Sequence, residues 1–103
     1  MTTQTGLGIK ELLADQRDEI LAIAEKHGAY NVRVFGSVAR GEATAESDVD
    51  FLIDYDRQCI SPWFPVGLIR DLETFLNRKV DVVSEKSLHY FLKDRILQEA
   101  VYL

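Results

Sequence analysis

The fold is decided by two short stretches, GSVARG at residues 36–41 and SDVD at residues 47–50, which a polar loop separates. A β-rich run at residues 32–35 precedes them, and an apolar run at residues 51–53 follows. This order predicts a strand, a tight Gly-Ser turn, a brief helix closed by the second glycine, a loop, and a second strand from residue 48 or 49 to about 55. We expect this unit to be the centre of a small α/β domain.

This unit brings together groups that can bind phosphate and groups that can bind a metal ion. The backbone N–H groups and the hydroxyl at Gly36 and Ser37 suit phosphate oxygens. Asp48 and Asp50 lie two residues apart on a predicted strand, so both carboxylates project from one face. Mg²⁺ prefers hard oxygen ligands and is typically held by one or two carboxylates together with substrate phosphates. Either a Gly-Ser turn or a pair of aspartates alone is more often structural. Together, with ten residues between Ser37 and Asp48, they indicate a site for a divalent cation carrying a triphosphate.

The segment before the first strand has a helical pattern. Apolar residues fall largely on one face from Ile9 to His27, although Gln16 interrupts the stripe. Gly28 follows and favours a helix end in the left-handed conformation. Residues 1–8 are small and polar with two glycines, and we expect them to be flexible.

The segment after the second strand predicts a helix, a third strand and a final helix. Residues 66–77 form an amphipathic pattern, and residues 80–83 are a short β-rich run. Ser87 is expected to cap a last helix that packs on the core, with residues 101–103 finishing it or adding an edge strand. The predicted inward positions are Leu88, Phe91, Leu92, Ile96, Leu97 and Ala100, and the predicted solvated positions are His89, Lys93, Asp94 and Glu99.

Asp81 is unusual because it lies inside the β-branched run of residues 80–83, where aspartate is normally depleted. A carboxylate at such a position needs a partner or a metal if it is buried. A lone aspartate of this kind is more often an edge-strand charge facing water. Because Asp48 and Asp50 already form a pair, we favour Asp81 as a third ligand.

Trp63 and Phe64 stand in the proline-containing connection between residues 56 and 65, where polar residues are more usual. They can fill the edge of the core, or they can form a surface for a partner or for base stacking. The sequence leaves these two interpretations equally open.

Composition limits what the chain can be. Its 103 residues, 47% hydrophobic and 28% charged, fit a single globular domain over residues 1–103. The formal net charge of −5 argues against direct nucleic-acid binding. The single cysteine, Cys59, excludes an internal disulfide and is expected to be partly buried. The sequence has neither a membrane-length apolar run nor a signal-peptide layout, so we expect a cytoplasmic protein.

The spacing of these motifs resembles a known superfamily. Gly36-Ser37, ten residues and Asp48-Val49-Asp50 are similar to the signature of the nucleotidyltransferases typified by DNA polymerase β. The short length and the run at residues 79–83 resemble the minimal nucleotidyltransferases (MNT), the antitoxins of HEPN–MNT toxin–antitoxin pairs. The resemblance covers residues 9–103 and implies an α/β (α+β) fold, a small twisted mixed sheet with helices packed on one side. One departure is Asn77, where glycine is expected, but asparagine also tolerates the left-handed conformation.

The resemblance also implies roles. Asp48 and Asp50 would hold two Mg²⁺ ions, and Asp81 would complete the metal site and act on the attacking hydroxyl. Gly36 and Ser37 would receive the β- and γ-phosphates of the substrate ATP. The resemblance implies transfer of AMP to a tyrosine of a HEPN ribonuclease toxin, in a hetero-oligomer, which silences the toxin.

Arg40 is a candidate phosphate contact, and its alternative is an ordinary surface charge.

Three other functions remain open. The chain could neutralise the toxin by covering it without chemistry, but a pure cover need not keep three aspartates. It could instead transfer a nucleotide to a small molecule, or to a nucleic acid. We expect both of these to need a second domain, and the acidic net charge disfavours a nucleic-acid acceptor.

Overall fold

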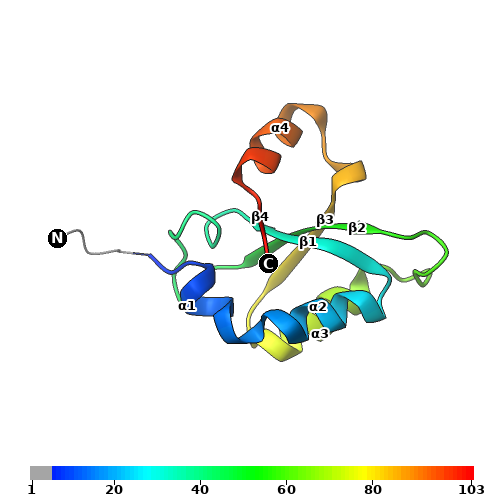
Figure 1. Ribbon diagram of the computed structural model, residues 1–103, viewed down its shortest axis with the longest axis horizontal. Coiled ribbons are helices and arrows are strands. Elements are labelled where there is room, and N and C mark those ends of the chain that lie inside the picture. The colour runs from blue at the N-terminus through cyan, green and yellow to red at the C-terminus, as the bar shows by residue number, and fades with distance from the viewer. Residues whose placement is uncertain (1–5) are drawn as a thin grey trace.

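The computed structural model describes residues 6–103, which form one four-stranded sheet with helices on both sides (Figure 1). The strands are β1 (Ala29–Phe35), β2 (Val49–Tyr55), β3 (Val80–Ser84) and β4 (Val101–Tyr102), arranged in the order β3-β2-β1-β4. β1 runs antiparallel to both β2 and β4, whereas β2 and β3 are parallel. The predicted mixed sheet is confirmed, and the last residues form the edge strand rather than extending the final helix.

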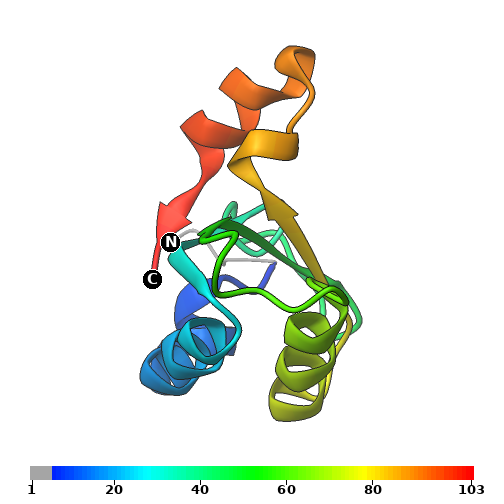
Figure 2. The same cartoon turned by 90° about the vertical axis from the view of Figure 1, so that its right-hand side faces the viewer.

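One face of the sheet is covered by α1 (Ile9–Leu13), the 3₁₀ turn η1 (Ala14–Gln16), α2 (Arg17–Lys26) and α3 (Val66–Leu76) (Figures 1 and 2). The single helix predicted from Ile9 to His27 is wrong, because the chain breaks at η1. The break falls where Gln16 interrupts the apolar stripe, and the residues on either side, Leu13 and Ile20, are both buried.

The helix ends follow the prediction. Gly28 has φ = 80° and ends α2, and Asn77 has φ = 52° and ends α3. Both residues therefore occupy the left-handed region. Glycine adopts it freely because it has no β-carbon, and asparagine tolerates it because its side chain is short and polar.

The core lies between the sheet and these helices. Val49, Phe51 and Ile53 of β2 are buried in it, together with Leu68 and Leu72 of α3. Because successive strand side chains alternate between faces, Asp50, Leu52 and Asp54 of the same strand lie on the opposite face, as the sequence predicts.

On that opposite face, the chain between β3 and β4 rises away from the sheet (Figure 2). It contains the 3₁₀ turn η2 (Glu85–Ser87) and α4 (Tyr90–Glu99). None of the ten residues of α4 is buried, and Phe91 remains 72% exposed. The predicted inward stripe of the last helix is therefore wrong, because α4 stands off the sheet instead of lying along it.

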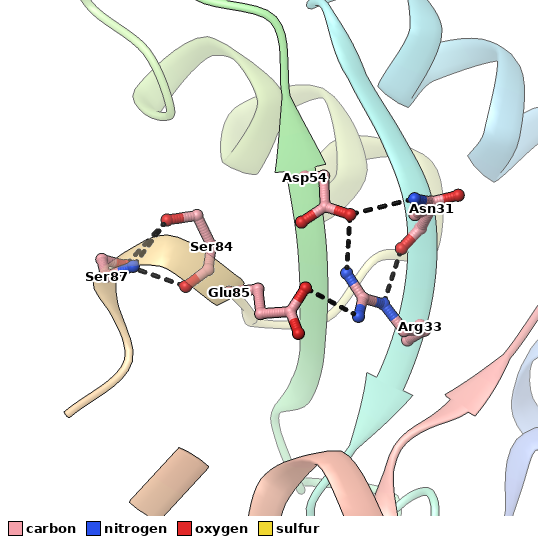
Figure 3. A network of polar contacts seen from close by, with 6 residues as sticks. All are labelled: Asn31, Arg33, Asp54, Ser84, Glu85 and Ser87. Atoms are coloured by element: carbon pink, nitrogen blue, oxygen red, sulfur yellow. Dashed lines mark hydrogen bonds and ion pairs between the residues drawn. The ribbon is translucent and has the colours of Figure 1, made fainter. Parts of the chain in front are cut away.

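The predicted cap of the last helix is also wrong. His89 caps α4 by accepting a hydrogen bond from the Phe91 N–H through its Nδ1. Ser87 instead belongs to η2, where its N–H donates to the hydroxyl of Ser84 (Figure 3).

Arg33 contacts both ends of the segment that carries α4, and Figure 3 shows the contact at its beginning, with Glu85. Its side chain is only 5% exposed, and Nη1 lies 3.5 Å from Oε2 of Glu85 at the beginning of the segment. The guanidinium also lies 5.4 Å from the ring centroid of Tyr102 at the end of the segment. Asp54 of β2 supplies the second carboxylate, with its Oδ2 3.4 Å from Nη2 of Arg33.

Three expectations about the surface can be compared with the structure. Trp63 is 78% exposed, whereas Phe64 packs against the core and lies 5.1 Å from Tyr55 between ring centroids. Cys59 is exposed rather than partly buried, because it lies in a turn at the end of β2. The flexibility predicted for residues 1–8 falls partly outside the described residues, and Leu7 pairs with Ala43 in an isolated β-bridge. Among residues 6–103, no helix has the length and apolar character to cross a membrane.

Candidate active site

The Gly-Ser turn (residues 36–41) lies directly against a carboxylate of β2. Gly36 has φ = 77°, and a β-carbon added there would lie 2.3 Å from Oδ2 of Asp50. Any other residue at position 36 would therefore adopt an unfavourable backbone conformation, and its β-carbon would displace the carboxylate of Asp50. Glycine is favoured here because of the left-handed φ, and it also leaves the Asp50 carboxylate in place beside the turn.

The brief helix predicted within this turn is not formed. Instead, the Arg40 N–H donates to the Gly36 carbonyl and the Gly41 N–H donates to the Val38 carbonyl, at 3.1 and 3.2 Å. These bonds close a series of turns, and Gly41 ends it with φ = 73°. The prediction is wrong because glycines in the left-handed region at both ends leave too little chain for a regular helix.

The loop that leads into β2 is held from two sides. The Ser47 hydroxyl accepts a hydrogen bond of 2.8 Å from the Thr44 N–H. Arg78 donates from Nη1 to the carbonyls of Thr44 and Ser47. These contacts fix the chain immediately before Asp48, which precedes β2 by one residue.

The three predicted aspartates lie on one face of the sheet. Asp50 of β2 is paired in parallel register with Asp81 of β3, so their side chains share the face opposite the helical core. Asp48 and Asp81 are exposed, whereas Asp50 is half-buried. Burial, followed by the negative charges of Asp81 and Asp48, raises the pKa of Asp50 from 3.8 to about 6.

These three aspartates (the acidic face) have the chemistry that Mg²⁺ requires. Within residues 6–103, no three His, Cys, Asp or Glu side chains are already arranged around a metal position. After burial, the negative charges of Asp81 and Asp48 are the next causes of the raised pKa of Asp50. A divalent cation would relieve that repulsion. The all-oxygen donor set therefore fits Mg²⁺, and metal binding stays a prediction.

Glu99, at the end of α4, is a site residue that sequence reasoning missed. Its placement on the solvated side of the last helix is wrong, since its side chain is only 18% exposed. Its Oε2 accepts a hydrogen bond of 3.0 Å from the Gly36 N–H, and its Oε1 pairs with Nη1 of Arg40. Burial acts to raise the pKa of Glu99, but the hydrogen bonds from Arg40 and Gly36 outweigh it and hold the pKa below its ordinary value.

The edge strand explains this position. Val34 of β1 is paired with Val101 of β4 in antiparallel register. Continuing that register by two residues brings Gly36 opposite Glu99. Glu99 could be placed beside the Gly-Ser turn only if it were known that residues 101–102 form a strand and in which register this strand pairs with β1.

Arg40 projects from the Gly-Ser turn between two carboxylates. Its Nε lies 3.0 Å from Oε2 of Glu42, and its Nη1 contacts Glu99. These contacts raise the pKa of Arg40, with the hydrogen bond to Glu99 as the largest cause. The guanidinium is thus at the turn, where a phosphate contact is predicted.

Gly36 lies against Asp50 of β2, Asp81 pairs with Asp50 from β3, and Asp48 directly precedes β2. This is the arrangement that the resemblance to nucleotidyltransferases implies. The family model described as "Nucleotidyltransferase domain" matches residues 17–103 of this chain. The chain therefore belongs to the nucleotidyltransferase family, as a member of its minimal type, and is a nucleotidyltransferase.

Several relatives have similar lengths. A candidate protein adenylyltransferase of Methanocaldococcus jannaschii is 42% identical over 83 residues, which cover 81% of this chain and 88% of that protein. The protein adenylyltransferase MntA of Thermococcus cleftensis is 35% identical over 95 residues and covers 92% of both chains.

Two solved structures share the fold. One, described as a minimal nucleotidyltransferase, superposes with a TM-score of 0.80 at 38% identity, over 96% of this chain and 99% of that one. The other is a toxin–antitoxin structure with AMP-PNP, with a TM-score of 0.68 over 84% of this chain and 71% of that one. At 18% identity, the second likeness shows the fold alone.

Proposed function

We propose that this nucleotidyltransferase transfers AMP from ATP to a hydroxyl group of a partner protein. The observation that carries the proposal is the register pair Asp50–Asp81, which brings two distant carboxylates together beside Gly36. The relatives that match most of the chain and are named as protein adenylyltransferases support a protein as the acceptor.

The residues of the site divide between metal and phosphate. Asp48 and Asp50, completed by Asp81, would hold two Mg²⁺ ions, which supply charge neutralisation for the entering and leaving oxygens of an in-line displacement. The N–H groups of the Gly-Ser turn and the hydroxyl of Ser37 bind the β- and γ-phosphates, and Arg40 adds a positive charge.

The reaction balances as a simple displacement. The acceptor oxygen forms a bond to the α-phosphorus, and the bond from that phosphorus to the bridging oxygen breaks, so pyrophosphate leaves with the electron pair. The proton of the attacking hydroxyl passes to the carboxylate of Asp81, which is exposed and therefore accessible to an acceptor. Positioning of the two reactants and neutralisation of charge supply most of the acceleration.

We propose that the acceptor is a tyrosine of a HEPN ribonuclease toxin, which is bound in a hetero-oligomer and silenced. The exposure of Asp48 and Asp81 supports a macromolecular acceptor, because a deep pocket would exclude one. The fold is also that of one chain in a toxin–antitoxin structure. An ATP-dependent reaction of this kind would take place in the cytoplasm.

The test is to incubate the chain with Mg²⁺, ATP labelled on the α-phosphate, and the protein encoded by the neighbouring gene, which the proposal expects to be a HEPN ribonuclease. Label should appear on a tyrosine of the ribonuclease, located by mass spectrometry, and the ribonuclease activity should fall. The double variant Asp48→Ala and Asp50→Ala should abolish both effects. Asp18→Asn, which changes a fully exposed carboxylate of α2, is the matched control and should leave both unchanged.

Full neutralisation of the ribonuclease by the double variant, with no label transferred, would mean that the chain acts by covering its partner. Label on a small molecule or a nucleic acid, with none on the ribonuclease, would assign a different acceptor.

A further inference from the structure

Two of the donors that the proposed function assigns to the triphosphate are bound to one carboxylate of the chain itself. The Gly36 N–H donates to Oε2 of Glu99 at 3.0 Å, and Arg40 pairs with the other oxygen, Oε1. A carboxylate held by a backbone N–H and a guanidinium presents two oxygens to the same kinds of donor that bind phosphate. Glu99 thus takes the position that a phosphate group would need.

The fold brings Glu99 to this position by its connection to β4. Glu99 is the last residue of α4, and the register of β4 on β1 sets it opposite Gly36. Arg33 fastens the segment at Glu85 and Tyr102. The backbone position of residue 99 is therefore fixed, while its side chain has rotatable bonds that let the carboxylate turn away.

We infer that Glu99 is an internal competitor for nucleoside triphosphate, which must displace its carboxylate from Gly36 and Arg40. This inference rests on the proposed function, because it concerns the same phosphate site. A triphosphate carries more negative charge and more acceptor oxygens than one carboxylate, so it can replace Glu99.

A different role for the same contact predicts the opposite result. If Glu99 served to hold Arg40 ready for phosphate, loss of its charge would weaken nucleotide binding. If Glu99 competes, loss of its charge strengthens binding. The sign of the change in dissociation constant therefore separates a competitor from a positioning residue.

The experiment compares three variants by calorimetric titration with Mg²⁺-ATP and with inorganic tripolyphosphate. Glu99→Gln removes the negative charge of the acceptor, so the bond from the Gly36 N–H becomes neutral and Arg40 loses its ion pair. Binding of both ligands should therefore tighten by about tenfold, since each of these weakened contacts has to be displaced. Glu99→Asp keeps the charge but shortens the side chain, and it should also tighten binding. Glu42→Gln is the matched control, since Glu42 also pairs with Arg40, through Nε, but does not bind the Gly36 N–H. It should change the dissociation constants by less than about twofold.

A second measurement reports the contact itself. The Gly36 amide resonance should move upfield in Glu99→Gln without ligand, and it should move on addition of tripolyphosphate to the unmodified protein. Unchanged or weaker ligand binding in both Glu99 variants would overturn the inference and leave the proposed function intact. Absence of triphosphate binding in every protein would overturn both. Tighter binding without label transfer to a ribonuclease would support the inference and refute only the proposed acceptor.

Discussion

Replacement of Asp50 by asparagine should stabilise the metal-free protein at neutral pH. Burial and the charges of Asp81 and Asp48 raise the pKa of Asp50 from 3.8 to about 6. Between those two values the folded protein holds a proton that the unfolded chain has released, so the stability falls as pH rises through this interval. The loss of stability caused by ionising Asp50 in the folded protein is absent below about pH 4 and complete above about pH 6.

The magnitude follows from the two pKa values. At 1.36 kcal/mol for each pKa unit, the full penalty is about 3 kcal/mol. Asp50 is only half-buried, and solvent screening reduces the contribution of such a group, so we expect about 1–2 kcal/mol. Asparagine has nearly the same shape as aspartate and carries no charge, so the variant should not show this penalty.

The assay is urea unfolding in EDTA at pH values from 4 to 8. The difference in unfolding free energy between Asp50→Asn and the unmodified protein should be near zero at pH 4 and reach about 1–2 kcal/mol in favour of the variant at pH 7. Asp18→Asn, which removes an exposed carboxylate, should show no such rise. A variant no more stable at pH 7 than at pH 4, relative to the unmodified protein, would refute the argument from burial and crowded charge.

Further predictions concern the metal, the core, the ion pairs of Arg33 and the left-handed residue Asn77. Mg²⁺ should raise the melting temperature of the unmodified protein but not that of Asp50→Asn, measured by differential scanning fluorimetry; equal shifts would exclude Asp50 as a ligand. Leu72→Ala, at a residue 2% exposed, should cost about 2–4 kcal/mol in urea unfolding, and a loss below 1 kcal/mol would contradict its place in the core. Arg33→Met should cost about 3 kcal/mol, because it leaves the carboxylate of Asp54 with less compensation; a change of less than about 1 kcal/mol would mean that the network contributes little. Asn77→Gly, at φ = 52°, should stabilise the protein by about 0.5–1 kcal/mol, and a destabilised variant would argue against left-handed strain there.

The parts of the site that follow local rules could be predicted from the sequence. Strand side chains alternate between faces, so Val49 and Phe51 in the core place Asp50 on the other side. The β-branched run around Asp81 predicts a strand, and the structure pairs it with β2 in the register that matches Asp81 with Asp50. The left-handed turn at Asn77 likewise follows from residue type alone.

The parts that depend on long-range packing could not be predicted. The apolar stripe of α4 indicates that this helix needs a partner, but it does not show whether the partner lies within the chain. Phe91 and Leu92 are exposed in the structure, so the apolar stripe does not indicate that α4 packs on the core. Glu99 has no local signal, because its contact with Gly36 depends on the register of a two-residue strand.

The exposed thiol of Cys59 offers a practical advantage for these measurements. It is the one cysteine of the sequence and follows the end of β2, whereas Asp50 lies near the beginning of that strand. A maleimide dye attached there would sit about 15 Å or more along the strand direction from the carboxylates. Fluorescence anisotropy of such a conjugate could therefore report association with a ribonuclease without any substitution in the chain.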